Sequence, residues 1–218
     1  MAQIFPRSSN TIAKASIVAL VIIVGLLGTA AFFFVRSPYI TWVSEAIVQP
    51  VQFSHKHHAG ELGISCLYCH TSVEDSWHAG IPPTKTCMNC HVQIWNQSPY
   101  LAPVRDSWSS GTPLQWNMVN VVAEFAYFNH SIHVAKGVGC ETCHGRVDEM
   151  NQIYKANSFQ MRWCMECHFN PEQYLRPREE VYTMGYQPPI PQAQLGAQLV
   201  KEYNINKGVL QNCDTCHH

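Results

Sequence analysis

The order of apolar and polar positions divides the chain into one long apolar run and a much longer stretch without regular periodicity. The apolar run extends from Ala15 to Val35 and contains no charged residue. Because about 20 consecutive apolar residues span the hydrocarbon core of a bilayer, it predicts a transmembrane helix over residues 15–36. Residues 1–14 are then expected to be a short cytoplasmic tail ahead of this helix.

A cleaved signal peptide is the alternative interpretation of the apolar run. A signal peptide has an apolar region of only about 7–15 residues, followed by small residues at the cleavage site. The run in this chain is longer, and it ends in three phenylalanines, Phe32 to Phe34, followed by Val35 and Arg36. This is a poor context for cleavage, so we expect an uncleaved single-pass anchor in the cell membrane.

The remaining chain, residues 37–218, is expected to be mainly α-helical with much irregular structure. Strand signals are weak, because the apolar run Val119–Val122 is too short to build a sheet. A short helix is predicted over Ala193–Tyr203, after a proline-containing extended connector over residues 185–192. Residues 92–127 are expected to form an ordered loop region.

Composition narrows the possible functions. Charged residues make up 13% of the chain, and the formal net charge is −1. The basic surplus typical of nucleic-acid binding is therefore missing, and we expect no nucleic-acid partner. The ten cysteines are the unusual feature, because so many can indicate disulfides, zinc ribbons or covalent haem attachment.

The spacing of the cysteines favours haem, because all ten fall into five C-x-x-C-H motifs. Random placement of the chain's cysteines and histidines would give about 0.02 such motifs. In c-type attachment two thiols bond to one haem and the adjacent histidine becomes the proximal iron ligand, whereas neither zinc ribbons nor disulfides require that histidine. The predicted attachment residues are Cys66, Cys69, Cys87, Cys90, Cys140, Cys143, Cys164, Cys167, Cys213 and Cys216, and the predicted proximal ligands are His70, His91, His144, His168 and His217.

An internal repeat organises four of the five motifs. An F-x-H-x-x-H unit begins at Phe53 and precedes the first motif, and a second unit begins at Phe128 and precedes the third. The second histidine of the unit is followed by the first cysteine of the motif after eight positions in the first copy and seven in the second. Each copy includes one further motif, so the copies span 53–91 and 128–168, and the fifth motif stands alone at 213–217.

Histidines outside the motifs are candidates for the sixth, distal ligand of each iron. Two histidines spaced by three lie on one face of a helix and can point at two different haems. His57 is replaced by Ile132 in the second copy, and His218 directly follows a proximal ligand, so neither is predicted to bind iron. The predicted distal ligands are His55, His58, His130, His133 and, from the segment before the second motif, His78.

Methionine is the alternative distal ligand at one haem, since His/Met ligation raises the reduction potential relative to bis-histidine ligation. The candidates are Met118, Met184 and, between the third and fourth motifs, Met150 and Met161, of which the last two are favoured. A methionine more often fills a core. Five distal ligands would close every iron to substrate. The ligand supply therefore favours electron transfer, and no catalytic residue is predicted.

The haem motifs also predict on which side of the membrane the domain lies and what fills its interior. Cytochrome c maturation attaches haem on the outer face of the membrane, so the domain over residues 37–218 would be extracytoplasmic, on the periplasmic side. The N-terminus would then be cytoplasmic. Arg7 and Lys14 ahead of the apolar run weakly favour this orientation, because basic residues are enriched on the cytoplasmic side. We expect stacked haems to replace most of the ordinary side-chain core of this domain.

The F-x-H-x-x-H unit followed by C-x-x-C-H resembles class III multihaem cytochromes c. With one N-terminal span, five motifs and the segment HAGIPPTKTCMNCH at 78–91, the chain resembles the pentahaem membrane-anchored subunit of alternative complex III over residues 15 to about 217. The resemblance implies five covalently attached haem c groups and allows one His/Met haem. It also implies an assembly with an iron–sulfur subunit, polytopic quinol-binding membrane subunits, and a monohaem cytochrome c or other acceptor.

The hypothesis is an electron-transfer subunit, not an enzyme by itself, that relays electrons from a quinol-oxidising membrane complex to a cytochrome or terminal oxidase in a respiratory or photosynthetic chain. One alternative is a tetrahaem-type quinol dehydrogenase cytochrome that feeds an extracytoplasmic reductase. The fifth motif and the spacer over residues 92–127 count against it. The other alternative is a multihaem oxyanion reductase, which would need one haem with an open coordination position.

Overall fold

The structure is a computed structural model that describes residues 4–6 and 8–217. Part of the expected tail over residues 1–14, and the whole of His218, lie outside the described residues. The chain divides into two compact units, Met1–Val43 and Ser44–His218.

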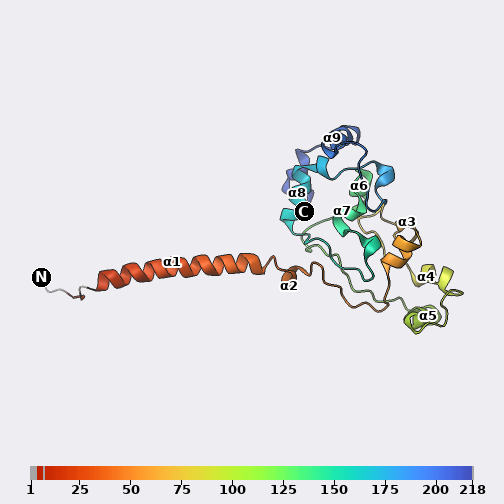
Figure 1. The fold of residues 1–218 in the computed structure, drawn as a ribbon, viewed down its shortest axis with the longest axis horizontal. Coiled ribbons are helices and arrows are strands. Elements are labelled where there is room, and N and C mark those ends of the chain that lie inside the picture. Colours follow the sequence, from red (N-terminus) through yellow and green to blue (C-terminus); the bar gives the residue numbers. More distant parts are fainter. Residues whose placement is uncertain (1–3, 7, 218) are drawn as a thin grey trace. The chain divides into compact units, whose positions relative to one another are not determined.

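The first unit is dominated by one helix, α1 (Ser9–Phe34), which Figure 1 shows without interruption. Its 26 residues rise by about 1.5 Å each, so α1 is long and apolar enough to cross a membrane. No side chain in it is buried. The helix begins before the predicted start at residue 15, because residues 9–14 contain no proline or glycine that would end it.

The helix ends close to the predicted boundary. The N–H of Val35 donates to the carbonyl of Ala31, and α1 stops before the Ser37–Pro38 pair. Pro38 opens the short helix α2 (Pro38–Thr41), where its missing N–H leaves no intrahelical bond unmade.

Short helices separated by irregular chain make up the second unit, as predicted. Their order follows the motifs: a helix or helical turn coincides with each C-x-x-C-H sequence. The elements are η1 (Lys56–Glu61), α3 (Cys66–Cys69), α4 (Thr84–His91), η2 (Pro99–Leu101), α5 (Ala102–Ser110), α6 (His130–Ala135), α7 (Cys140–His144), η3 (Val147–Glu149), α8 (Met161–Phe169), η4 (Pro171–Gln173), η5 (Arg178–Glu180), α9 (Gln192–Glu202), η6 (Val209–Gln211) and η7 (Cys213–Thr215).

The described part of the second unit contains no strand, only two isolated bridges that join Ala46 to Tyr154 and Val138 to Leu175. The helix predicted over residues 193–203 is confirmed as α9. The spacer over residues 92–127 is more regular than the predicted loop, because it contains η2 and α5.

Helix α5 was not predicted from the sequence because prolines surround it. Pro103 lies in the first turn of α5, where proline is tolerated. Gly111 follows the last turn with φ of 70°, the left-handed conformation that ends helices. A hydrogen bond of 2.7 Å between the hydroxyls of Thr84 and Ser107 ties α5 to α4.

The side-chain core of the second unit is sparse. The main apolar cluster packs α9 against the segment after η4, and Gly196 lies so close to the backbone of Glu172 that any side chain there would clash. Among the described residues the buried apolar side chains are Val51, Val73, Val104, Met150, Leu175, Val181, Leu195, Leu199 and Tyr203. A domain of this length normally buries most of the surface of its unfolded chain, so the core is incomplete with protein alone.

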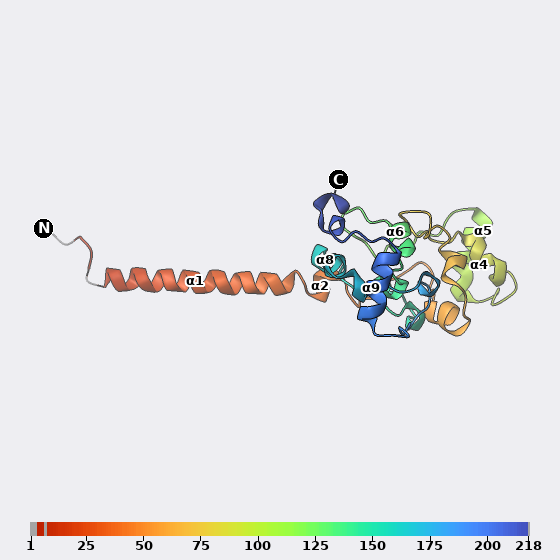
Figure 2. The same ribbon diagram turned by 90° about the horizontal axis from the view of Figure 1, so that it is seen from above.

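Within the second unit the motifs are spread along one direction. Figures 1 and 2 both place α4 and α5 at one end of this unit and α8 with the C-terminal segment at the other. Helices α6 and α7 lie between these ends in both views.

Candidate functional site

Each of the five C-x-x-C-H motifs lies on a helix or a helical turn. The first four lie on the α-helices α3, α4, α7 and α8, and the fifth begins on the 3-10 turn η7. At the first motif the hydroxyl of Ser65 accepts a hydrogen bond from the N–H of Leu67 and so caps α3. The spacing therefore presents two thiols and one imidazole on one short segment.

None of the ten cysteines forms a disulfide with another. Burial raises the pKa of Cys140 to about 11 and that of Cys143 to about 12, with neighbouring thiols adding to the effect. No cluster of three or more potential metal ligands occurs among the described residues.

Three of the predicted distal histidines face a motif histidine across a narrow gap. In each pair one ring comes from an F-x-H-x-x-H unit and the other from a C-x-x-C-H motif. The centroid separations and interplanar angles are 6.1 Å and 66° for His58 with His91, 6.3 Å and 5° for His130 with His144, and 6.3 Å and 32° for His133 with His168.

This separation fits two imidazoles on one metal ion. A metal–nitrogen bond of about 2 Å on each side, plus about 1.1 Å from each nitrogen to its ring centre, gives a centroid separation of about 6 Å. Imidazoles in direct stacking contact would lie closer. The gap is therefore the size of an axially coordinated iron, and the residues fit haem.

Backbone carbonyls orient most of the predicted ligands. A carbonyl oxygen only accepts, so each of these Nδ1 atoms carries the proton and Nε2 keeps the lone pair that a metal needs. The pairs and their distances are His58 with Ser54 (2.8 Å), His70 with Gly80 (2.7 Å), His91 with Ile94 (3.0 Å), His130 with Trp77 (2.8 Å), His133 with Asn129 (2.7 Å), His168 with Leu210 (2.8 Å) and His217 with Phe125 (2.7 Å).

His55 lies beside His70, the proximal candidate of the first motif. Burial, and then repulsion from His70 and His58, lower the pKa of His55 to about 4. Its Nδ1 is buried and has no hydrogen-bond partner among the described residues. The first histidine of the unit thus lies by the first following motif in both copies, because His130 faces His144 in the same way.

Each F-x-H-x-x-H unit is organised by its phenylalanine, a role that the sequence pattern contained but did not reveal. Phe53 stacks on His58 (4.4 Å, 23°) and meets His55 edge-on (4.9 Å, 86°). Phe128 repeats this with His133 (4.5 Å, 28°) and His130 (4.7 Å, 89°). One aromatic ring therefore positions two imidazoles that face two different motifs.

His78 carries its ring proton on the other nitrogen from the histidines that donate to carbonyls. Its Nδ1 accepts a hydrogen bond of 3.1 Å from the N–H of Gly80, so the proton of the neutral ring is on Nε2. His78 lies in the loop that also holds His70 and His130 through backbone carbonyls. The structure therefore associates His78 with the first and third motifs.

The two methionine candidates occupy different environments. Met150 is buried, and its methyl group lies near Gly145. Met161 is 65% exposed and begins α8, the helix that packs against η6 just before the fifth motif.

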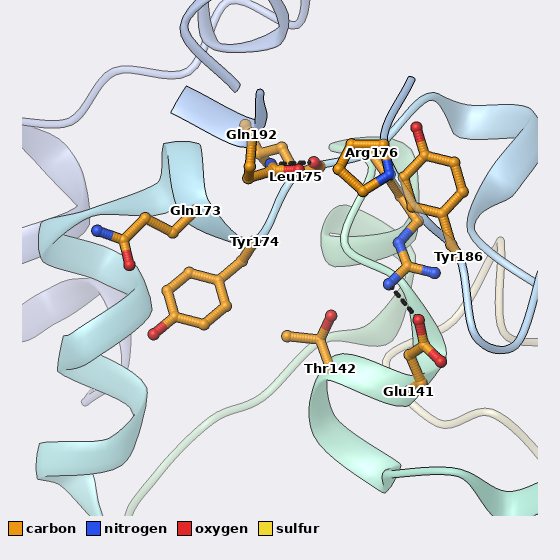
Figure 3. Close-up of a pocket in the computed structure, with 9 residues that line it drawn as sticks. Glu141, Thr142, Gln173, Tyr174, Leu175, Arg176, Tyr186 and Gln192 are labelled. Atoms are coloured by element: carbon orange, nitrogen blue, oxygen red, sulfur yellow. Dashed lines mark hydrogen bonds and ion pairs between the residues drawn. The ribbon is translucent and has the colours of Figure 1, made fainter. Parts of the chain in front are cut away.

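A buried ion pair holds the third motif in place, and sequence reasoning did not find it (Figure 3). Arg176 donates to the carboxylate of Glu141, between the two cysteines of that motif, at 2.7 Å. The other carboxylate oxygen accepts from the N–H of Gly185, and the guanidinium lies 5.0 Å from the ring centre of Tyr186. The pair lines a cavity of about 340 Å³.

Comparison with known proteins agrees with this geometry. Residues 126–218 match the family described as cytochrome c7 and related cytochrome c, and this region contains the third, fourth and fifth motifs. The chain is also similar to the menaquinone reductase multiheme cytochrome c subunit of Nitratidesulfovibrio vulgaris. The two are 28% identical over 143 residues, which cover 56% of this chain and 68% of that protein.

The motif conformation, the facing imidazoles and these matches agree on the cofactor and on the class. The thioether-forming cysteines of such a protein hold haem c covalently. The chain therefore contains a cytochrome c7-like multihaem domain, with two further motifs ahead of it.

Proposed function

We propose that this chain is the pentahaem electron-transfer subunit of a membrane complex that exchanges electrons with the quinone pool. The observation that carries the proposal is the set of facing imidazoles, His58/His91, His130/His144 and His133/His168, at 6.1 to 6.3 Å. With both axial positions of an iron filled, substrate has no place to bind. The chain then conducts electrons and does not itself catalyse a reaction.

The residues have distinct tasks in this proposal. The ten motif cysteines anchor five haem c groups, the five motif histidines are proximal ligands, and His55, His58, His130 and His133 are distal ligands. When bound, haem c supplies iron centres that each take up and release one electron. The carbonyls that accept from Nδ1 fix the ring planes and increase the basicity of Nε2.

The fifth motif is proposed to be the His/Met site. His217 is held by the carbonyl of Phe125, whereas His78 lies with the first and third motifs. Met161 begins the helix that packs beside the fifth motif. We therefore favour Met161 over His78 and Met150 as its distal ligand; replacing Met161 with leucine should abolish the sulfur–iron charge-transfer band of the oxidised protein, while Met150→Leu should leave it.

Helix α1 is proposed to anchor the haem domain on the extracytoplasmic side of the membrane, with the N-terminus in the cytoplasm. Its length and composition support an anchor. Protease treatment of intact spheroplasts should remove the haem domain from a membrane-bound stub. Protection of the domain in spheroplasts, with cleavage only in inverted vesicles, would contradict this orientation.

The partners are proposed to be an iron–sulfur subunit, polytopic quinol-binding subunits and a monohaem cytochrome c or other acceptor, as in alternative complex III. Purification in mild detergent tests this set, because these subunits should co-purify. The name of the relative, a menaquinone reductase subunit, favours a second candidate in which electrons flow toward the quinone. Reduction of the purified complex by a menaquinol analogue supports quinol oxidation, and quinone reduction by a reduced cytochrome supports the reverse.

The haem count and ligation can be measured directly. The mass of the intact protein and the pyridine haemochrome absorbance should both give five haems per chain. The oxidised protein should be entirely low-spin. A high-spin signal that shifts on addition of nitrite or cyanide would contradict the conductor and would favour the multihaem oxyanion reductase.

A further inference from the structure

We infer that the five haem attachment motifs are arranged in space in the order second, first, third, fourth, fifth. The second motif (Cys87–His91) and the fifth (Cys213–His217) would then form the two ends of the path. This inference rests on the proposed function, since it takes each motif to carry a haem. It adds the sequence of neighbours, which the order along the chain does not give.

The second and first motifs are joined directly. Asn89, between the cysteines of the second motif, donates from Nδ2 to the hydroxyl of Tyr68, between the cysteines of the first, at 2.9 Å. The F-x-H-x-x-H unit ahead of the first motif also reaches the second, since His58 faces His91. These two motifs are therefore neighbours.

The segments around the first motif connect the first copy to the second copy. Helix η1, ahead of the first motif, packs against η3, after the third, and the N–H of Lys56 donates to the carbonyl of Met150 at 2.9 Å. Gly60 lies so close to the carbonyl of Asp148 that a side chain there would clash.

A second connection between these motifs runs through the loop after His70. The N–H of Ser131 donates to the carbonyl of Ser76 at 3.2 Å, and Nδ1 of His130 donates to the carbonyl of Trp77 at 2.8 Å. His130 is the residue that faces His144 of the third motif. The first motif therefore adjoins the third.

The third and fourth motifs share one distal unit, because the ring of Phe128 contacts both His130 and His133. The Nδ2 of Asn157 donates to the carbonyl of Cys143 at 2.7 Å. From the third motif a series of aromatic rings leads to α8: His144 to Phe159 at 6.3 Å, then Phe159 to Trp163 at 5.1 Å.

The fourth motif is connected to the fifth at the other end. His168 donates from Nδ1 to the carbonyl of Leu210 in η6, at 2.8 Å. Helix α8 packs against η6, and η6 packs against η7, which carries the fifth motif. Figures 1 and 2 agree with the resulting order, since α4 lies at one end of this unit and α8 with the C-terminal segment at the other.

The order has a consequence that distinguishes two matched variants, His55→Met and His58→Met. Methionine raises the potential of the haem it ligates, so that haem takes its electron before the others. A ferrous iron has one positive charge fewer than a ferric iron, and the change acts most strongly on the nearest haems. Reduction of an interior haem therefore lowers the midpoint potentials of its two neighbouring haems. Reduction of a terminal haem lowers the midpoint potential of its single neighbour.

Redox titration of both holo-variants, with dithionite supplying one electron per iron and ferricyanide removing it, tests the order. EPR and NMR signals follow each haem. We expect two lowered potentials in His55→Met and one in His58→Met. One lowered potential in His55→Met and two in His58→Met would match the order along the chain and overturn the inference.

An iron-edge anomalous difference map of the holo-protein provides a test that does not depend on the distal ligands. We expect the iron attached at Cys66 and Cys69 to lie between those of the second and third motifs. Finding this iron at an end overturns the order. If neither methionine variant raises a potential while the map shows the expected order, the distal ligand set has failed and the inferred arrangement stands.

Discussion

The two copies of the repeat build the same ligand unit on different backbones. Both place one phenylalanine against two histidines, with distances that agree to within a few tenths of an ångström. The second copy does this on an ordinary α-helix, α6, whereas the first uses η1, a π-helix. A π-helix accommodates one additional residue, and the first copy has one more residue between its unit and its motif. The insertion was absorbed in the turn, and the ligand geometry was kept.

The copies differ in the angle between facing rings and in the residues around each motif. His130 and His144 are nearly parallel at 5°, while His58 and His91 are inclined at 66°. Glu141 in the third motif pairs with Arg176, but Leu67 holds the matching position in the first motif. The unit thus determines which imidazoles face each other, while the angle between the facing rings differs from copy to copy.

The largest expected effect follows from removing a distal ligand in either copy. His133→Ala and His58→Ala should each convert about one fifth of the haem to the high-spin state, measured by EPR and the visible spectrum. Replacing His57 with isoleucine, the residue of the second copy, is the matched control and should leave the spectrum unchanged. Equal spectra for all three variants and the parent would show that the distal assignment is wrong.

The next effect is on stability and is confined to the second copy. Arg176→Met leaves the Glu141 carboxylate without its cation in a largely buried site, which costs about 3–5 kcal/mol. The free energy of unfolding from urea titration of the holo-protein measures this loss. The double variant Glu141→Leu with Arg176→Met makes the site resemble the first copy and should recover much of the stability; a double variant as unstable as the single would contradict the ion-pair explanation.

A smaller effect is expected from the phenylalanine that both copies share. Phe128→Leu removes ring contacts worth about 0.5–1.5 kcal/mol in addition to buried area, and it frees the planes of His130 and His133. Two low-spin EPR signals should therefore broaden or shift together, while those of the first copy stay fixed. Phe128→Tyr keeps the ring and should give the EPR signals of the parent protein. Phe53→Leu should instead broaden or shift the two EPR signals of the first copy.

The smallest effect concerns Arg146 and Asp148, which follow the third motif; Ser72 stands where the second copy has Arg146. The hydrogen-bonded guanidinium lowers the pKa of the Asp148 carboxyl. This contribution is present above the ordinary pKa of aspartate and is lost as pH falls through the lowered one. Because the Arg146 side chain is solvent-exposed, solvent screening keeps this contribution small. Asp148→Asn should slightly flatten the acid limb of the stability profile, and an unchanged limb would contradict this explanation.

The sequence alone predicted the apolar helix, the mainly helical fold and the haem motifs, because these depend on local spacing. Two thiols within one helical turn and a long uncharged run need no information from distant residues. The phenylalanine contacts were implicit in the F-x-H-x-x-H pattern, but their geometry required coordinates. The helix α5 was missed because its turn signals resemble those of a loop.

Features that join distant segments were not predictable. Arg176 and Glu141 are 35 positions apart, and no periodicity relates them. His78 was predicted as the fifth distal ligand because it precedes the second motif, but the sequence did not reveal the hydrogen bonds that connect it to His70 through Gly80. The interleaved order of the motifs likewise arises from contacts such as Tyr68 with Asn89.

The sparse side-chain core has a consequence for how the cell controls the amount of this protein. A chain that buries so few apolar side chains of its own gains little from collapse, and a group attached only to the folding chain shifts the balance toward the folded form. Unloaded chains would remain open to proteases. The abundance of this cytochrome should therefore follow haem supply and the capacity of the attachment machinery, with transcription setting only an upper limit.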